Sequence, residues 1–114
     1  MSDLNQKTCE ACRLDAPRAT QDEISNFLSS YPHWTLMNVE GVQQLQRIYT
    51  FASFEAALAF TKAVGAIAED EGHHPAILTE WGKVTVTWWS HKIKGLHVND
   101  FIMCAKCDSA HNIT

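Results

Sequence analysis

The chain has 114 residues, of which 46% are hydrophobic and 19% are charged. The length fits one domain with a single core, and the composition is that of a folded globular protein rather than a disordered one. Nine basic residues against thirteen acidic residues give a net charge of −4. This balance argues against direct nucleic-acid binding, because such proteins carry an excess of positive charge.

No targeting or membrane signal is visible in the sequence. The N-terminus lacks the apolar core of a signal peptide, and no segment is apolar enough to span a bilayer. We therefore expect a cytoplasmic protein without a membrane partner. Residues 1–18 are interpreted as a flexible N-terminal tail and residues 19–114 as a single domain.

The first predicted element is a short helix. Thr20 and Glu23 form a capping box, which marks a helix N-terminus. The apolar spacing behind this box extends the helix to about Ser30.

The remainder of the chain alternates strands with helices. Period-two patterns and turn residues predict two hairpins, 34–39 with 42–51 and 76–81 with 83–89, with turns at Glu40-Gly41 and Gly82-Lys83. A long helix over about 54–71 begins after Ser53, and a final helix begins at Asn99 or Asp100. The order α-β-β-α-β-β-α predicts an α+β fold, a four-stranded antiparallel sheet with helices packed on one face.

Three histidines fall close together in this predicted fold. His73 and His74 follow the long helix, and His91 follows the fourth strand. If Gly82 and Lys83 form the turn, the hairpin register places His91 opposite His74. Imidazole is the usual general acid and base, because its unperturbed pKa lies nearest neutrality. The cluster therefore indicates an acid–base site.

The same cluster is compatible with other interpretations. Glu69, one helical turn before His73, can orient a ring or hold a substrate amine. A zinc site is disfavoured, because His73 and His74 point in opposite directions in an extended chain and no pair has the usual helical spacing. The other three histidines of the chain, His33, His97 and His111, are interpreted as surface residues without a role.

The four cysteines form two Cys-x-x-Cys pairs, Cys9 with Cys12 and Cys104 with Cys107. Such pairs can bind zinc or form a redox disulfide. The long separation between the pairs exceeds that of a zinc ribbon, and the context of Cys9 lacks the strand and helix of a thioredoxin-like motif. Two reduced pairs are expected, and a shared metal or redox role stays open.

A longer pattern extends over most of the chain. It reads Glu69-x-x-x-His73-His74-Pro75, five residues to Trp81, nine more to His91 and eight more to Asp100. This spacing resembles the signature of the pterin-4a-carbinolamine dehydratase family, and the resemblance covers about residues 20–105. It implies the same α+β fold and an assembly into homodimers or homotetramers. Apolar residues such as Ile48 and Trp89 on the open sheet face also favour cover by a second subunit.

The resemblance also implies an activity and a site. The reaction is dehydration of a 4a-hydroxytetrahydropterin to quinonoid dihydropterin, which recycles the pterin of aromatic amino acid hydroxylases. The implied catalytic residues are His73, His74 and His91. Our hypothesis within this set is that His74 is the principal acid–base residue at the hydroxyl, and that His73 and His91 assist proton movement and hold the ring. The resemblance also implies that Pro75 and Ser90 bind the substrate. Glu69 is a third candidate substrate-binding residue, because its carboxylate can accept hydrogen bonds from the amino group of the pterin. No metal and no cofactor is expected, because the pterin is the substrate.

Two further expectations remain. Trp34 and Trp81 are candidates to stack on the pterin, although burial is the more common environment of tryptophan. The alternative to the enzyme is a non-catalytic assembly factor or regulatory dimerisation module on the same fold. The presence of all three signature histidines favours the enzyme.

Overall fold

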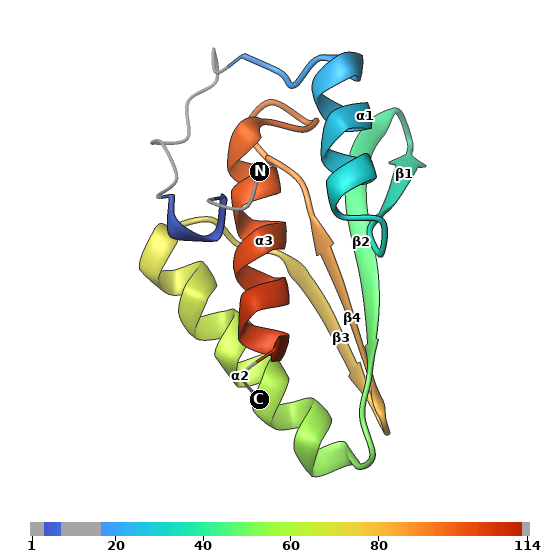
Figure 1. Cartoon of the computed structure of the whole chain (residues 1–114), viewed down its shortest axis with the longest axis vertical. Helices are drawn as coiled ribbons and strands as arrows, with labels where there is room; N and C mark the ends of the chain where they lie inside the picture. The colour runs from blue at the N-terminus through green and yellow to red at the C-terminus, as the bar shows by residue number, and fades with distance from the viewer. Residues whose placement is uncertain (1–3, 8–16, 113–114) are drawn as a thin grey trace.

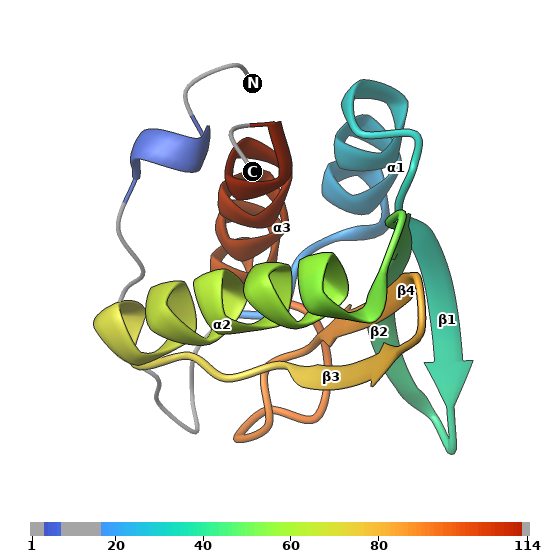
Figure 2. The same cartoon turned by 90° about the horizontal axis from the view of Figure 1, so that it is seen from below.

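The computed structural model describes residues 4–7 and 17–112. In this part of the chain, three helices lie on one face of a four-stranded antiparallel sheet, as Figures 1 and 2 show. The elements are α1 (Gln21–Ser30), β1 (Thr35–Val39), β2 (Val42–Thr50), α2 (Phe54–Glu71), β3 (Ala76–Glu80), β4 (Lys83–Trp88) and α3 (Val98–Asn112). The predicted fold class and element order are confirmed. No helix within the described residues is long and apolar enough to cross a membrane.

Local signals set the ends of the first two helices. The Thr20 hydroxyl accepts a hydrogen bond from the Glu23 amide at 3.1 Å, and the Glu23 carboxylate accepts one from the Thr20 amide at 2.8 Å. Ser53 caps α2 by accepting from the Ala56 amide at 3.0 Å. Gly72 ends α2 with a φ of 64°, which a residue without a β-carbon adopts readily. These boundaries agree with the sequence prediction.

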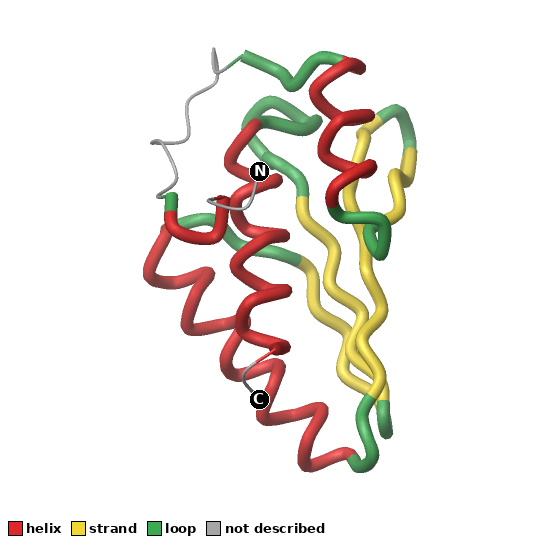
Figure 3. The backbone as a smooth tube through the Cα atoms, viewed as in Figure 1, coloured by secondary structure: helices red, strands yellow, loops and turns green. Residues whose placement is uncertain are grey.

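The strands are ordered β1-β2-β4-β3, and Figure 3 shows the two hairpins side by side. The first turn is at Glu40-Gly41, as predicted, with φ values of 52° and 82°. The predicted turn of the second hairpin is wrong. Glu80 pairs with Lys83, so the two turn residues are Trp81 and Gly82, and the register is shifted by two positions.

Gly82 explains this shift. Its φ of 70° supplies the left-handed residue of the turn, and its carbonyl accepts a hydrogen bond from the Phe51 amide at 2.8 Å. A β-carbon at Gly82 would lie 3.0 Å from the Phe51 carbonyl oxygen, so the close approach also favours glycine. Trp81 lies at the tip of this turn and is 72% exposed. The expectation that it is buried is wrong.

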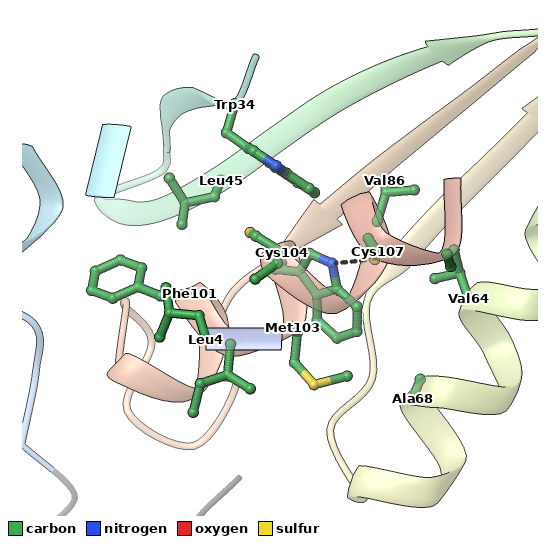
Figure 4. Packing of buried hydrophobic residues seen from close by; sticks show 14 of the residues in the cluster. Leu4, Trp34, Leu45, Val64, Ala68, Val86, Phe101, Met103, Cys104 and Cys107 are labelled. Carbon is green, nitrogen blue, oxygen red and sulfur yellow. Dashed lines mark hydrogen bonds between the residues drawn. The ribbon is translucent and has the colours of Figure 1, made fainter. Parts of the chain in front are cut away.

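The core lies between the sheet and the helices. Alternate residues of the central strands face the helices and are buried, and Figure 4 shows part of this packing. They are Leu45, Tyr49, Val84, Val86 and Trp88. On the opposite face, Ile48 and Leu78 both neighbour Thr85 across the sheet, and they are 52% and 58% exposed.

Asp108 connects α3 to the sheet. Its carboxylate accepts hydrogen bonds from the Tyr49 hydroxyl at 2.6 Å, the Arg47 guanidinium at 2.7 Å and the Trp34 indole at 3.1 Å. Burial, followed by the nearby Cys107 and Asp108, raises the pKa of Tyr49. Trp34 is buried, as expected. The carboxylate therefore satisfies three donors in a region with little access to water.

The N-terminal segment differs from the expected tail at Leu4–Gln6, which form a short 3-10 turn, η1. Leu4 is buried among core residues, and the removal of its apolar side chain from water stabilises this position of the turn. The Asn5 amide donates to the Ser109 hydroxyl at 2.7 Å, and Lys106 donates to the Asn5 carbonyl at 3.0 Å. These contacts hold the turn on α3. Most of the remaining tail, including Cys9 and Cys12, lies outside the described residues.

Candidate active site

The end of α2 places two adjacent histidines in different environments. The Gly72 amide donates to the Glu69 carbonyl at 3.3 Å, and the His73 amide donates to the Ala68 carbonyl at 3.1 Å. Together with the left-handed Gly72, these bonds turn the chain sharply. The His73 side chain is 3% exposed, whereas that of His74 is 58% exposed. One imidazole is therefore part of the interior and the other faces solvent.

The three candidate histidines meet at one pocket. It has a volume of about 370 Å³ and is lined by Gly72, His73, His74, His91 and Lys92. Ligand pockets have volumes of ~300–1,000 Å³, so this pocket is large enough for a small ring system. The histidines converge although the predicted register was wrong, because β4 ends at Trp88 and a short loop then carries His91 to the pocket.

Asp100 is the buried partner of His73. One carboxylate oxygen lies 2.7 Å from His73 Nε2, and the other accepts from the Ser90 hydroxyl at 2.8 Å and the His97 amide at 2.9 Å. Asp100 is fully buried, and buried carboxylates are stable only when they are paired in this way. A carboxylate accepts hydrogen bonds, so Nε2 is the ring nitrogen that donates in this contact.

In the sequence, Asp100 stands at the end of the signature pattern and is a candidate cap of the final helix, but no site role was assigned to this residue. The helix-cap prediction is wrong, because α3 begins earlier, at Val98. His97 precedes the helix, and its Nδ1 accepts from the Asn99 amide at 3.0 Å. The signal for Asp100 was its position at the end of the pattern that begins at Glu69. The burial of the Asp100 carboxylate beside His73 distinguishes it from a carboxylate that only caps a helix at the surface.

The His73 ring also packs against the core. Its plane lies 15° from that of the Trp88 ring, with 5.5 Å between the centroids. Trp88 is fully buried, and its indole N–H donates to Cys107 Sγ at 3.3 Å, the dashed line in Figure 4. His73 therefore has its ring plane set by Trp88 and its Nε2 set by Asp100.

Glu69 pairs with His74, not with His73. Its Oε1 accepts from His74 Nε2 at 2.7 Å, and the Glu69 side chain is 81% exposed. An exposed pair of this kind adds little to stability, typically about 0–1 kcal/mol. The contact instead orients the ring of His74, which lines the pocket.

His91 and Lys92 complete the pocket. The His91 ring stacks on Trp89, with 4.4 Å between centroids and 30° between planes. Lys92 was not foreseen, and only its position next to His91 in the sequence could have indicated it. Pro75 is half-buried and Ser90 is buried, and neither is among the five residues that line the pocket. The contact of Ser90 is with Asp100, behind His73.

The other histidines differ in environment. His33 is exposed, as expected. His97 is 4% exposed, so its placement at the surface was wrong. His111 packs against Tyr49, with 4.9 Å between ring centroids. Burial, followed by the charge of Arg47, lowers the pKa of His111.

The described cysteines are buried and free. Burial raises the pKa of Cys104 well above its usual value and raises that of Cys107 to about 12. Thiols are nucleophiles and metal ligands in the thiolate form, which such values suppress. Across residues 4–7 and 17–112, no group of three or more His, Cys, Asp or Glu side chains is arranged to hold a metal ion. The arrangement of Cys9 and Cys12 lies outside the described residues.

The fold and the pocket together define the class of this protein. It is an α+β protein that gathers three imidazoles at a pocket, with a buried carboxylate behind one of them. The family model for pterin 4 alpha carbinolamine dehydratase matches residues 17–110. The chain belongs to the pterin 4 alpha carbinolamine dehydratase family.

Similar proteins agree with this assignment. A protein of Syntrophotalea carbinolica, named "Putative pterin-4-alpha-carbinolamine dehydratase", is 58% identical over 109 residues, which cover 96% of this chain and 97% of that protein. The crystal structure of a transcriptional coactivator/pterin dehydratase from Brucella melitensis has a TM-score of 0.74 at 26% identity and covers 82% of this chain and 98% of that one.

A more distant neighbour shares the fold alone. It is a pterin dehydratase-like protein described as a RuBisCO assembly factor in the alpha-carboxysome. The TM-score is 0.58 at 22% identity, and the likeness covers 68% of this chain and 87% of that one.

Proposed function

We propose that this protein catalyses the dehydration of a 4a-hydroxytetrahydropterin to quinonoid dihydropterin and water. The observation that carries the proposal is the convergence of His73, His74 and His91 on one pocket. Membership of the pterin carbinolamine dehydratase family supports the same substrate class. No metal and no organic cofactor is needed, because the reaction is a proton-assisted loss of water.

The chemistry requires one proton to be delivered and one to be removed. The C4a–O bond breaks as the hydroxyl leaves with a proton, the N5 proton is lost, and a C4a=N5 double bond forms. We assign the proton delivered to the hydroxyl to His74, which is exposed at the pocket and oriented by Glu69. His73 and His91 take part in removing the N5 proton. Each such proton transfer contributes ~100–10,000-fold.

The supporting residues follow from their positions. Glu69 is not among the residues that line the pocket, but its exposed carboxylate pairs with His74, which is. We assign to this carboxylate a hydrogen bond from the pterin amino group. Ser90 acts through Asp100, which it contacts at 2.8 Å. Pro75 follows His74 directly and shapes the backbone beside the ring. All three assignments are part of the proposal.

The biological setting proposed from the sequence is recycling of the pterin used by an aromatic amino acid hydroxylase, in the cytoplasm. We also propose a homodimer or homotetramer. Exposed Ile48 and Leu78, which flank Thr85 on the open sheet face, support this because apolar patches mark interaction surfaces. Sedimentation velocity would test it: a monomer at micromolar concentration contradicts the proposal.

The alternative is an assembly factor or regulatory dimerisation module. The RuBisCO assembly factor has a related fold, so the architecture alone does not discriminate between the two functions. The pocket does favour the enzyme, because a scaffold has no need for three imidazoles around a cavity of about 370 Å³. A folded native chain without dehydratase activity would favour the alternative.

The first test is dehydration of synthetic 4a-hydroxytetrahydropterin, followed by ultraviolet absorbance. The native protein should accelerate the reaction, and His74→Ala should lose ~100-fold or more of that acceleration. His33→Ala, at an exposed position outside the pocket, is the matched control and should retain full activity. If His74→Ala is unaffected while His73→Ala or His91→Ala is inactive, the reaction stands and the principal proton transfer moves to that residue.

A further inference from the structure

The segment that precedes α1 is attached to the loop that carries His91. The Ala19 amide donates to the Leu96 carbonyl at 2.8 Å, and Arg18 Nη1 donates to the Lys94 carbonyl at 3.2 Å. Arg18 lies far from His91 in the sequence and does not line the pocket. It nevertheless contacts the loop on which His91 depends for its position.

This loop is a tight turn held by its own backbone. Ser90 and Gly95 form a bridge, with hydrogen bonds of 2.8 and 3.4 Å, and the Lys94 amide donates to the His91 carbonyl at 3.4 Å. Lys94 has a φ of 50°, which residues with a β-carbon disfavour. The hydrogen bond that Arg18 donates to the Lys94 carbonyl comes from outside the loop, and it helps to keep Lys94 in this conformation.

Gly95 provides the space for the guanidinium. A β-carbon added to Gly95 would lie 2.8 Å from Arg18 Nη1, and its three nearest atoms would all belong to Arg18. Gly95 does not have a positive φ, so its backbone conformation does not require glycine. A methyl group at this position would therefore push the flexible end of the Arg18 side chain away from the loop, while the loop backbone itself could stay in place.

The position of the His91 ring depends on this loop, whereas the position of the His73 ring is fixed by contacts of its own. His73 is held by Asp100 and by Trp88, whereas His91 is exposed and its one described ring contact is with Trp89. The place of the His91 ring is therefore set mainly by the backbone of its loop. Anything that fixes that backbone also fixes the imidazole at the pocket.

We propose that Arg18 is a positioning residue for the reaction, acting on His91 through its contacts with Lys94 and Gly95. The proposal rests on the proposed function for its kinetic consequence, but not for its structural one. Removing the guanidinium should leave the fold intact, because the contact is exposed to solvent, and should loosen the loop. A misplaced catalytic group lowers the rate of the chemical step, here by roughly tenfold to a hundredfold.

The variants Arg18→Ala and Gly95→Ala test this contact from both sides. Each should lower kcat more than it changes KM and should alter the pH profile of kcat. In the double variant, Gly95→Ala should add almost nothing, because its methyl group no longer meets a guanidinium. Arg18→Lys keeps a donor of the same charge and should recover part of the rate. Lys62→Ala, an exposed lysine of α2, removes the same charge and should behave as the native protein.

A second readout separates this proposal from the proposed function. The imidazole ¹⁵N and ¹H resonances of His91 should shift or broaden in Arg18→Ala and in Gly95→Ala, while those of His73 stay in place. The Gly95 amide should exchange with solvent faster in both variants. Unchanged His91 resonances in Arg18→Ala, or an equal effect of Gly95→Ala in both backgrounds, would overturn the proposal. If the native protein has no dehydratase activity, the proposed function fails and the resonances alone decide the role of Arg18.

Discussion

His73 and Asp100 are separated by 27 positions in the sequence, yet their side chains meet at 2.7 Å in the interior of the protein. The same carboxylate holds Ser90 after β4 and the His97 amide before α3. Asp100 therefore joins three segments of the chain and sets the hydrogen-bonding role of a histidine at the pocket. A substitution of Asp100 should affect both activity and stability.

Asp100→Asn should lower kcat by ~10–100-fold with a smaller loss of stability. The amide keeps one acceptor, but its nitrogen can donate to His73 Nε2 and so favour the wrong tautomer. Asp100→Ala should also lose about 1–3 kcal/mol for each buried donor left without a partner, among them the Ser90 hydroxyl. Steady-state kinetics and urea unfolding measure the two effects. An Asn variant with native kcat would show that the tautomer of His73 does not matter.

Glu69→Gln should change the kinetics and leave the stability nearly unchanged. The Glu69–His74 pair is exposed, so its loss should cost less than about 1 kcal/mol. The loss of the carboxylate should raise KM and weaken proton delivery by His74. Asp70→Asn removes a neighbouring exposed carboxylate outside the pocket and is the matched control. Equal kinetic effects of the two substitutions would contradict a specific role for Glu69.

His111 should contribute to acid sensitivity. Its pKa is lowered in the folded protein by burial and then by Arg47, so the unfolded chain binds a proton more readily. The stability associated with neutral His111 is present above the ordinary histidine pKa of about 6.5 and is lost as the pH falls through the lower folded value. His111→Gln should reduce the difference between urea midpoints at pH 7 and pH 5. The effect should be small, because this ring is only partly buried.

Cys104 and Cys107 should resist alkylation while the protein is folded. With a pKa of about 12 for Cys107, its thiolate is on the order of a thousand times scarcer at pH 8 than that of an ordinary cysteine. Iodoacetamide labelling, located by peptide mass spectrometry, should mark both residues only after unfolding in urea. Rapid labelling in the native protein would contradict the burial of these thiols.

Asp108→Ala should destabilise the protein by about 2–4 kcal/mol, because it leaves the Tyr49 hydroxyl, the Trp34 indole and the Arg47 guanidinium without their acceptor. Asp108→Asn keeps one acceptor oxygen and should lose less. Urea unfolding of the two variants measures the difference. Equal midpoints for the native protein and Asp108→Ala would show that these donors find other partners.

The elements with local signals could be predicted from the sequence, and those set by tertiary contacts could not. Thr20, Ser53 and Gly72 act on their own backbone neighbourhood, so the helix ends that they define were predicted correctly. The second hairpin was misplaced because either Trp81-Gly82 or Gly82-Lys83 fits a two-residue turn. The position of Gly82 against Phe51 selects the first of these, and that contact is invisible in the sequence.

In the candidate site, too, the features with local sequence signals could be predicted and those set by tertiary contacts could not. His73, His74 and His91 follow ends of predicted elements, so their proximity could be inferred without the correct register. The partner of Glu69 could not, because the choice between His73 and His74 depends on how the chain turns at Gly72. The role of Asp100 and the burial of His97 could not be inferred either, because a helix cap at the surface would have the same sequence.

The strand order has a consequence for how the protein folds. Each hairpin closes through a two-residue turn, but the central pairing joins β2 to β4, which belong to different hairpins and are separated in sequence by α2 and β3. Pairings between distant segments form slowly, because the chain entropy of the intervening loop is lost first. We therefore expect the β2–β4 pairing to limit the rate of folding. Since Asp100 meets Ser90 and His73 only in the assembled sheet-and-helix unit, a partly folded chain has no complete site.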